Sequence, residues 1–195
     1  LTNGFPSNIP GQHVIGNIMP DWLGGVFGTV KYRGLTLNVL FDMKVGGDIY
    51  DMGTSIARIT GVLKESEAGR EEGTIAVGVK NIGTSESPQY VPNDVVVPTR
   101  QLMGYYSGRQ YHEAAVFDAS YVKLRELALT YTLPSKLFEN NFLQGASVSL
   151  IGRNLAILFK NTTHIDPEVS EGRLGYNYGQ LPSSRSIGLN LNVKF

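Results

Sequence analysis

The stretch Arg185-Ser-Ile-Gly-Leu-Asn-Leu-Asn-Val-Lys-Phe195 alternates between apolar and polar side chains as far as its final Phe. A period of two predicts a β-strand with one apolar face and one polar face. Such strands occur in β-sandwiches, which bury one face, and in outer-membrane barrels, where the apolar face meets lipid. An apolar ladder that ends on an aromatic residue is unusual for a domain in water, whose terminal residues are usually frayed and polar, and is typical of a barrel strand. This strand alone leaves both interpretations open.

The composition excludes several classes of protein. Lys+Arg and Asp+Glu balance at 17 each in 195 residues, so no basic field indicates a nucleic-acid partner. Cysteine is absent, which excludes disulfides and thiolate metal sites. The 23 glycines and 10 tyrosines are typical of strands, tight turns and aromatic girdles. No apolar run approaches the length of about 18 residues that a membrane-spanning helix needs.

The same alternation predicts further strands, separated by connections of unequal length. We expect adjacent antiparallel strands, hydrogen-bonded in chain order, near residues 25–32, 35–45, 119–133, 146–158 and 185–195. A change of phase near Arg125-Glu126 predicts a β-bulge, and Arg33-Gly34 predicts a tight turn. The connections are alternately short and long, as periplasmic turns and extracellular loops are in membrane barrels. The two long connections are residues 46–118 and 160–184.

In a barrel, this pattern assigns each side chain to lipid or to the lumen. The lipid-facing residues would include Leu37, Val39, Phe41, Leu189 and Leu191. The lumen-facing residues would include Asn38, Asp42, Lys44, Asn190 and Asn192.

The first long connection is expected to have structure of its own, since structureless loops of this length are uncommon. Thr54 or Ser55 is predicted to cap a short helix whose one side carries Ile56, Ile59 and Leu63. A short buried strand is predicted at 74–79, and a solvated turn at 64–72.

Several local motifs resemble one family when they are taken in order. They are Ile15-Gly-Asn-Ile-Met-Pro20, Gly24-Gly25, Tyr32-Arg33-Gly34-Leu35, Gly46-Gly47-Asp48-Ile49-Tyr50, Asp118-Ala-Ser-Tyr-Val-Lys-Leu-Arg-Glu-Leu-Ala-Leu-Thr-Tyr-Thr-Leu-Pro134, Arg153-Asn154-Leu155, Asp166-Pro167-Glu168 and Pro182-Ser-Ser-Arg185. Together they resemble the carboxyl-terminal part of SusC/RagA-type TonB-dependent transporters of Bacteroidota outer membranes. The resemblance covers nearly the whole chain.

The resemblance implies an all-β fold: the last five or so antiparallel strands of a 22-stranded transmembrane barrel with long extracellular loops. Residues 1–195 would then be the C-terminal segment of that barrel, without the plug and the TonB box. An odd set of five strands does not close a bacterial barrel. The implied partners are the remaining barrel and plug, the TonB system, a SusD-like surface lipoprotein that acts as a lid, outer-membrane lipid and the barrel-assembly machinery. Phe195 would serve that machinery as an assembly signal.

The expected activity is import of oligosaccharides or peptides across the cell outer membrane, energised through TonB. Two alternatives remain open. A soluble β-sandwich carbohydrate-binding module would bury its apolar ladder, and a passive porin segment would have neither lid nor plug.

No catalytic chemistry is expected from the polar residues, and no cofactor. Asp166 and Glu168 could in principle form a calcium site or a glycosidase pair, but a structural turn is the favoured interpretation, since glycoside hydrolysis needs two carboxylates at a fixed separation. The three histidines, His13, His112 and His164, are far apart in sequence, so no metal site is expected. Tyrosines in the outer loops could stack on sugar rings or contact the lid, although packing between loops is the favoured role. These are Tyr105, Tyr106, Tyr111, Tyr176 and Tyr178.

Overall fold

A computed structural model describes residues 1–8, 10–107, 110–139, 142–169 and 175–195. The chain divides into two compact units. Unit 1 consists of Leu1–Ile18, Asp48–Phe117 and the described part of Ser170–Gln180, and unit 2 of Met19–Gly47, Asp118–Val169 and Leu181–Phe195. The second expected loop, 160–184, is therefore shared between the units, and its residues 170–174 lie outside the described residues.

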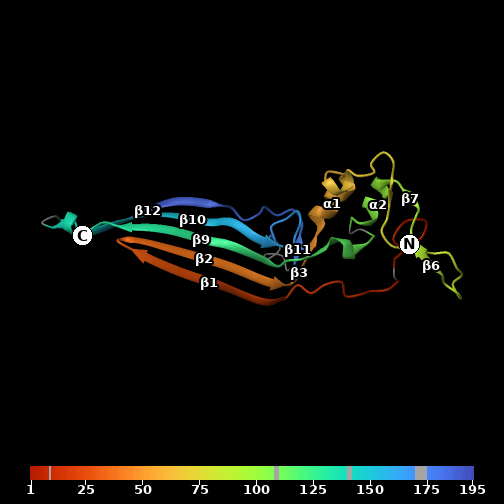
Figure 1. Cartoon of the computed structure of the whole chain (residues 1–195), viewed down its shortest axis with the longest axis horizontal. Helices are drawn as coiled ribbons and strands as arrows, with labels where there is room; N and C mark the ends of the chain where they lie inside the picture. The colour runs from red at the N-terminus through yellow and green to blue at the C-terminus, as the bar shows by residue number, and fades with distance from the viewer. Residues whose placement is uncertain (9, 108–109, 140–141, 170–174) are drawn as a thin grey trace. The chain divides into compact units, whose positions relative to one another are not determined.

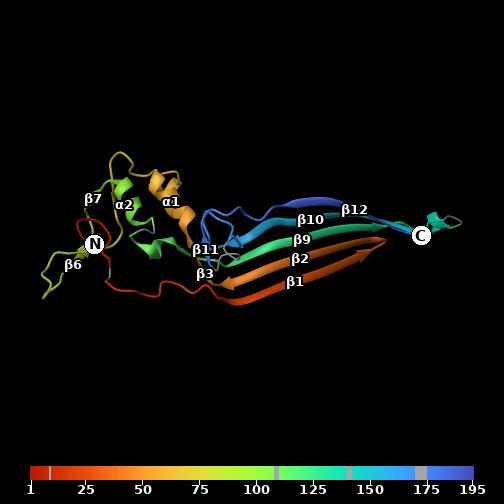
Figure 2. The ribbon, with the colours of Figure 1, turned by 180° about the vertical axis from the view of Figure 1, so that it is seen from behind.

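Unit 2 is built on an antiparallel sheet with the strand order β1-β2-β9-β10-β12, which Figure 1 and the view from behind in Figure 2 both show. Its strands are β1 (Pro20–Tyr32), β2 (Leu35–Gly46), β9 (Tyr121–Thr132), β10 (Gly145–Lys160) and β12 (Ser186–Lys194). The prediction of five adjacent strands in chain order is confirmed. β1 begins at Pro20, earlier than expected, because the first position of a strand tolerates a residue without an N–H group.

The predicted turn and bulge are both present in this sheet. Arg33 and Gly34 have φ values of 45° and 85°, as a two-residue type I′ hairpin turn requires. Pairing between β2 and β9 passes from Leu40 opposite Glu126 to Phe41 opposite Leu124, which leaves Arg125 as the extra residue. The change of sequence phase at this point therefore reflects a real bulge.

The register aligns side chains of one kind in rows across all five strands. One row is apolar and consists of Val30, Leu37, Leu129, Leu150 and Leu189. The next row, on the opposite face, is polar and consists of Lys31, Thr36, Thr130, Ser149 and Asn190. We call these surfaces the apolar face and the polar face of the sheet.

Unit 2 also contains one short helical turn, and one short strand lies where the chain passes from unit 1 into unit 2. η3 (Ser135–Phe138) is a 3-10 turn between β9 and β10, and β8 (Val116–Asp118) crosses from unit 1 into unit 2. After β8, Ala119 N–H donates to the Gly47 carbonyl at 2.8 Å, so the chain enters β9 beside the end of β2.

Unit 1 contains most of the first long connection, which has structure of its own as predicted. Its elements are β3 (Asp48–Asp51), α1 (Met52–Thr60), η1 (Lys64–Ser66), β4 (Thr74–Ile75), β5 (Val79–Asn81), β6 (Tyr90–Pro92), β7 (Val96–Val97), α2 (Thr99–Tyr105), η2 (His112–Ala115) and β11 (Tyr176–Asn177). The strands form a sheet of order β11-β3-β8 and the two pairs β4-β7 and β5-β6.

The prediction of the helix cap was wrong by one turn. Asp51 is the N-cap of α1, and its carboxylate accepts hydrogen bonds from the Thr54 amide and hydroxyl. Asp51 is fully buried and also accepts a 2.7 Å hydrogen bond from Asn177. A carboxylate at this position satisfies amide groups that have no partner within the helix. The helix ends at the left-handed Gly61, so the expected apolar side does not reach Leu63.

The single buried strand predicted at 74–79 is also wrong. β4 and β5 are separate short strands, and between them Ala76 is buried whereas Val77 is 95% exposed. Ala76 joins Val97 and Leu102 in the small core of unit 1. In the described part of the chain, no helix is long and apolar enough to cross a membrane.

Candidate functional site

The polar face of unit 2 holds a charge cluster made of Asp42, Lys123, Arg125, Asp166 and Glu168. β2 supplies Asp42 and β9 supplies the two cations. The other two carboxylates belong to the Asp166–Glu168 turn, which follows β10. Cross-strand pairing places Asp42 opposite Lys123, so the sheet itself puts opposite charges side by side.

Lys123 is the most deeply buried member of the charge cluster. Its side chain is 2% exposed, and Nζ donates to Asp166 Oδ1 at 2.5 Å and to Glu168 Oε2. Nζ also lies 5.1 Å from the centre of the Tyr121 ring. A buried ammonium group is tolerated only when it is paired in this way, because the loss of hydration is large.

Arg125, the extra residue of the bulge, connects the sheet to the turn. Its guanidinium donates to Asp42 on β2 and to both oxygens of Glu168. Because the bulge shifts the alternation by one residue, Glu126 also lies on the polar face, where it pairs with Arg153 at 2.9 Å. The bulge therefore concentrates charged side chains at one level of the polar face.

Residues from other motifs surround the charge cluster. Arg125 donates to Asn154 Oδ1 at 2.8 Å, and Asn154, at φ 51°, donates to the Ser184 carbonyl at 3.0 Å. Ser183 donates its hydroxyl to Asp166 at 2.6 Å. Pro167 is fully buried between the two carboxylates of the turn. Four motifs that are far apart in the sequence thus meet at one point.

The carboxylates of the turn are held in their charged form. Burial alone would raise the pKa of Asp166, but hydrogen bonds from Lys123 and Ser183 lower it below its usual value. Burial would likewise raise the pKa of Glu168, but hydrogen bonds from Arg125 and Lys123 outweigh the effect of burial, and the pKa is lowered. A glycosidase acid needs a raised pKa, and these two groups have the opposite shift.

A structural role for the turn agrees with this geometry, since its carboxylate oxygens accept hydrogen bonds from two cations, two hydroxyls and two backbone amides of the chain itself. Within the described ranges, no group of three His, Cys, Asp or Glu side chains has the arrangement of a metal site. Of the three histidines, His112 accepts or donates a 2.9 Å hydrogen bond with the Tyr50 hydroxyl, and His13 contacts the Pro10 carbonyl.

The other residues expected in the lumen lie on the same polar face by register. Asn38 Oδ1 accepts a 2.8 Å hydrogen bond from Thr29, and Lys44 is paired with Tyr121 across the strands and is 9% exposed. Asn190 and Asn192 lie opposite Ser149 and Ser147. All five residues expected in the lumen therefore share one face of the sheet.

The expected loop tyrosines separate into two groups within unit 1. Tyr176 and Tyr178 stack at 5.9 Å and an interplanar angle of 14°, and Tyr50 lies 5.7 Å from Tyr176. Tyr176 and Tyr178 remain 46% and 58% exposed. The pair therefore leaves aromatic ring surface exposed to solvent.

The remaining tyrosines pack within unit 1. Tyr105 stacks on Phe5 at 4.8 Å, and Tyr106 meets Tyr111 edge to face at 6.3 Å. Tyr106 also packs against the core of unit 1, and burial raises its pKa, with Tyr111 adding to the effect. Each of these three rings therefore packs against another aromatic ring of unit 1.

Lys123 and Arg125 were not expected to form part of the site. The signal was available, because a strand that alternates apolar residues with Lys and Arg needs acidic partners on its polar side. The partners come from a segment 43 residues away, and nothing local in the sequence indicates which carboxylates they are.

Comparisons with known proteins agree with the resemblance. No protein-family model matches the chain. TonB-dependent receptor P26 of Formosa agariphila is 29% identical over 190 residues, covering 93% of this chain and 18% of the relative. TonB-dependent receptor P3 of the same organism is 26% identical over 196 residues, covering 94% of this chain and 17% of the relative. The chain thus spans less than a fifth of the length of these relatives.

Solved structures show the same fold. The chain superposes on the RagAB peptide transporter with a TM-score of 0.61 and 23% identity, covering 91% of this chain and 17% of that chain. For the RagAB peptide importer in its closed-closed state, the TM-score is 0.60 and the identity 21%. The superposition covers 94% of this chain and 18% of that chain. These relatives confirm the resemblance to TonB-dependent receptors, and the solved structures confirm the antiparallel all-β fold.

Proposed function

We propose that this chain forms part of the wall and outer loops of a TonB-dependent transporter in the cell outer membrane. Unit 2 would supply five strands of a larger barrel, 22-stranded in the family that the chain resembles, and unit 1 an extracellular loop region. The complete protein would import oligosaccharides or peptides, with energy delivered through TonB and a plug located elsewhere in the protein.

The observation that carries this proposal is the exposed apolar face of unit 2. Along the row defined above, Val30, Leu150 and Leu189 are 66%, 50% and 79% exposed. A continuous apolar surface across five strands is unfavourable in water, whereas lipid covers such a surface in an outer-membrane barrel. The strands contain 13, 12, 12, 16 and 9 residues, and about 9–11 tilted residues cross the hydrocarbon layer.

The edges of the sheet support a larger closed wall. In the described sheet, β1 pairs only with β2, and β12 pairs only with β10. Strand edges with unpaired backbone groups are not stable in hydrocarbon, so a membrane sheet must close into a barrel. Further strands of the complete protein would have to pair with β1 and β12.

The charge cluster fits the lumen side of such a wall. It fastens the turn that follows β10 to the polar face, so this part of the second loop would lie against the inner wall. The exposed Tyr176–Tyr178 pair would be available to a substrate or to a SusD-like surface lipoprotein that covers the barrel mouth. Asp166 and Glu168 are paired with Lys123 and Arg125, so they would support that loop without contacting the substrate or the lipoprotein.

Two alternatives are less well supported. A soluble β-sandwich module would cover Val39, Phe41, Leu189 and Leu191 with a second sheet, whereas these residues all belong to one sheet and Leu191 is 66% exposed. A passive porin segment would need neither TonB nor a lid, whereas the relatives are named TonB-dependent receptors and the solved structures a peptide importer.

Uptake by cells that produce or lack the complete protein tests this function. Labelled oligosaccharides and peptides should enter only when the protein is present, and removal of TonB should abolish entry. A SusD-like lipoprotein should copurify from detergent extracts. TonB-independent entry would support the porin alternative, and purification of the chain as a stable monomer without detergent would support the module.

Phe195 is proposed to act as part of an assembly signal. It is 69% exposed and its ring lies 5.4 Å from that of Phe142. An unpaired edge strand can add to another sheet through its backbone, with alternate side chains setting the specificity. Deleting Phe195 from the complete protein should reduce membrane assembly but not synthesis. Normal assembly would leave Phe195 as an aromatic residue of the membrane interface only.

A further inference from the structure

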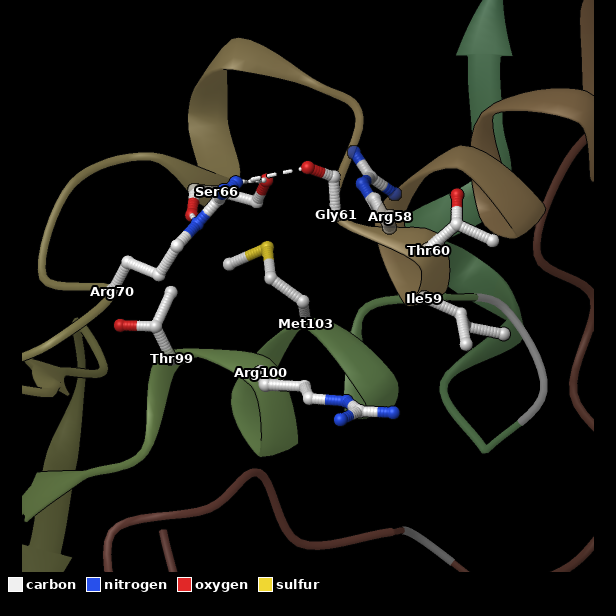
Figure 3. A pocket seen from close by; sticks show the side chains of 9 residues that line it. All are labelled: Arg58, Ile59, Thr60, Gly61, Ser66, Arg70, Thr99, Arg100 and Met103. Carbon is white, nitrogen blue, oxygen red and sulfur yellow. Dashed lines mark hydrogen bonds between the residues drawn. The ribbon is translucent and has the colours of Figure 1, made fainter.

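A cavity of about 560 Å³ in unit 1 is lined by three arginines from different segments. Arg58 belongs to α1, Arg70 to the segment after η1, and Arg100 to α2. Figure 3 shows these side chains arranged around that of Met103. No acidic residue belongs to the described lining, which is completed by Ile59, Thr60, Gly61, Ser66 and Thr99.

Arg58 is occupied by its structural contacts. Its Nε lies 2.6 Å from Glu65 Oε1, and Nη1 donates to the carbonyl oxygens of Tyr106 and Ala114 at 2.8 and 2.5 Å. The side chain is 12% exposed. Arg58 therefore holds α1 to neighbouring segments, and its charge is balanced by a carboxylate.

Among the described residues, no carboxylate balances the charges of Arg70 and Arg100. Within the described ranges, Arg70 donates to uncharged oxygens only, those of the Gly61 carbonyl at 2.9 Å and of Ser66. Across the described residues, no carboxylate oxygen lies within 4.0 Å of either guanidinium group. The bonds of Arg70 fix its guanidinium against the chain, so little side-chain entropy is left to lose on binding.

The rest of the lining is apolar or already hydrogen-bonded. Ile59 and Met103 contribute apolar surface. The Thr99 hydroxyl donates to the Gly69 carbonyl at 2.6 Å, and the Ser66 hydroxyl to the Leu63 carbonyl at 2.7 Å. The cavity thus combines two unbalanced cations with an apolar surface, which suits a ligand that carries an oxyanion beside a less polar part.

We propose that this cavity binds an oxyanion, such as the carboxylate of an acidic peptide or of an acidic saccharide, through Arg70 and Arg100. A planar guanidinium matches the geometry of a carboxylate and forms paired, charge-assisted hydrogen bonds with it. The two cations are supplied by different segments, so a bound anion would bridge the segment after η1 and α2. Binding should weaken as salt is added, because both side chains are exposed.

This site goes beyond the proposed transport role. Binding at the cavity is measured on purified protein, without TonB, a lid or a membrane potential. If the protein does not transport, binding at the cavity can still be detected. If the cavity does not bind an anion, the proposed transport role still stands.

The test is titration of the complete protein in detergent with two matched pairs of probes. One pair is triglutamate and triglutamine, and the other is a galacturonate trisaccharide and the neutral galactose trisaccharide. Each is measured on the parent protein, on the Arg70→Gln/Arg100→Gln variant and on a Lys31→Gln/Lys136→Gln control. The control removes the same charge from exposed lysines that do not line the cavity.

Acidic probes should bind more tightly than their neutral partners. The arginine variant should weaken acidic binding by at least about tenfold, which is the loss expected when even one charge-assisted hydrogen bond is removed. Binding of only triglutamate or only galacturonate would support the site and identify the ligand class, and binding of both would assign it to the oxyanion alone. Equal binding of acidic and neutral probes, or an equal loss in the lysine control, would overturn the proposal. If the double variant assembles poorly, Arg100→Gln alone serves, because Arg100 makes no ion pair with a described residue.

Discussion

The apolar and polar faces of the five-stranded sheet are formed by the same strands, yet their side chains find partners in different ways. On the apolar face, Leu189 is 79% exposed and Leu150 50% exposed. On the polar face, Lys123 is only 2% exposed, because Asp166 and Glu168 fold over it. The polar face obtains its partners from the chain, whereas the apolar face needs a partner outside it.

This difference follows from the medium that each face requires. An apolar side chain exposed on a sheet gains free energy from any apolar cover, at roughly 25 cal/mol per Å². A charged side chain in a barrel lumen can remain in water, or it can pair if the geometry is good. Lys123 and Arg125 are paired, and their carboxylates hold a loop in place. In the proposed barrel wall, the apolar face would therefore place the sheet in lipid, and the polar face holds the loop that follows β10.

The largest expected effect is on the polar face, at Lys123. Lys123→Met would leave Asp166 buried with no cation on Oδ1, and loss of one partner of a buried pair costs about 3–5 kcal/mol. We expect faster proteolysis within 160–169 and a lower unfolding midpoint in denaturant for the complete protein.

Arg153→Met is the matched control for this change. The Arg153–Glu126 pair joins β10 to β9 on the same polar face. Its side chains are 63% and 33% exposed, so its loss should cost no more than about 1 kcal/mol. Equal destabilisation by the two variants would mean that burial does not distinguish the charge cluster from an ordinary surface ion pair.

A smaller effect is expected when the same charge is added to either face. Leu189→Arg should lower the yield of assembled barrel, since a charge at mid-membrane on the lipid side costs about 2–4 kcal/mol. Asn190→Arg, at the next residue, places the charge on the polar face and should be tolerated. Heat-modified gel mobility of the complete protein reports the folded fraction, and similar losses would contradict the assignment of the two faces.

Acid should release the loop from the polar face, with the smallest effect of the three. The pKa values of Asp166 and Glu168 are lowered in the fold, so their stabilising contribution is full above the usual carboxyl pKa of about 4. It is lost as the pH falls through the lowered values. Proteolysis within 160–169 should therefore be constant from pH 8 to about pH 5 and rise only in stronger acid. A rise between pH 8 and 6 would implicate another group.

The strands and their faces could be predicted from the sequence because alternation is a local property. The bulge at Arg125 was predictable for the same reason, since the change of phase between Leu124 and Leu127 is visible in the sequence. The turn at Arg33-Gly34 needed only its spacing and its glycine. Each of these features depends on residues that are close together in the chain.

The predictions that failed depended on contacts between distant segments. Asp51 caps α1 and is held by Asn177, which lies 126 residues away in the sequence. Ser66 and Arg70 belong to the run 64–72, for which the sequence predicts a solvated turn, but Ser66 is buried and both residues line the cavity of unit 1. Likewise, the sequence indicated that the Asp166–Glu168 turn was structural, but not that it would fold onto β9.

The most direct test is to measure what surrounds adjacent residues of β12. This chain has no cysteine, so Leu189→Cys and Asn190→Cys each provide one spin-label site, once any cysteines elsewhere in the complete protein are replaced. In lipid vesicles, a label at 189 should be relaxed by oxygen, which partitions into hydrocarbon, and a label at 190 by a water-soluble nickel chelate. The same alternation should continue at 191 and 192. If both labels respond to the nickel chelate to the same extent, the apolar face does not meet lipid and the proposed barrel wall is wrong.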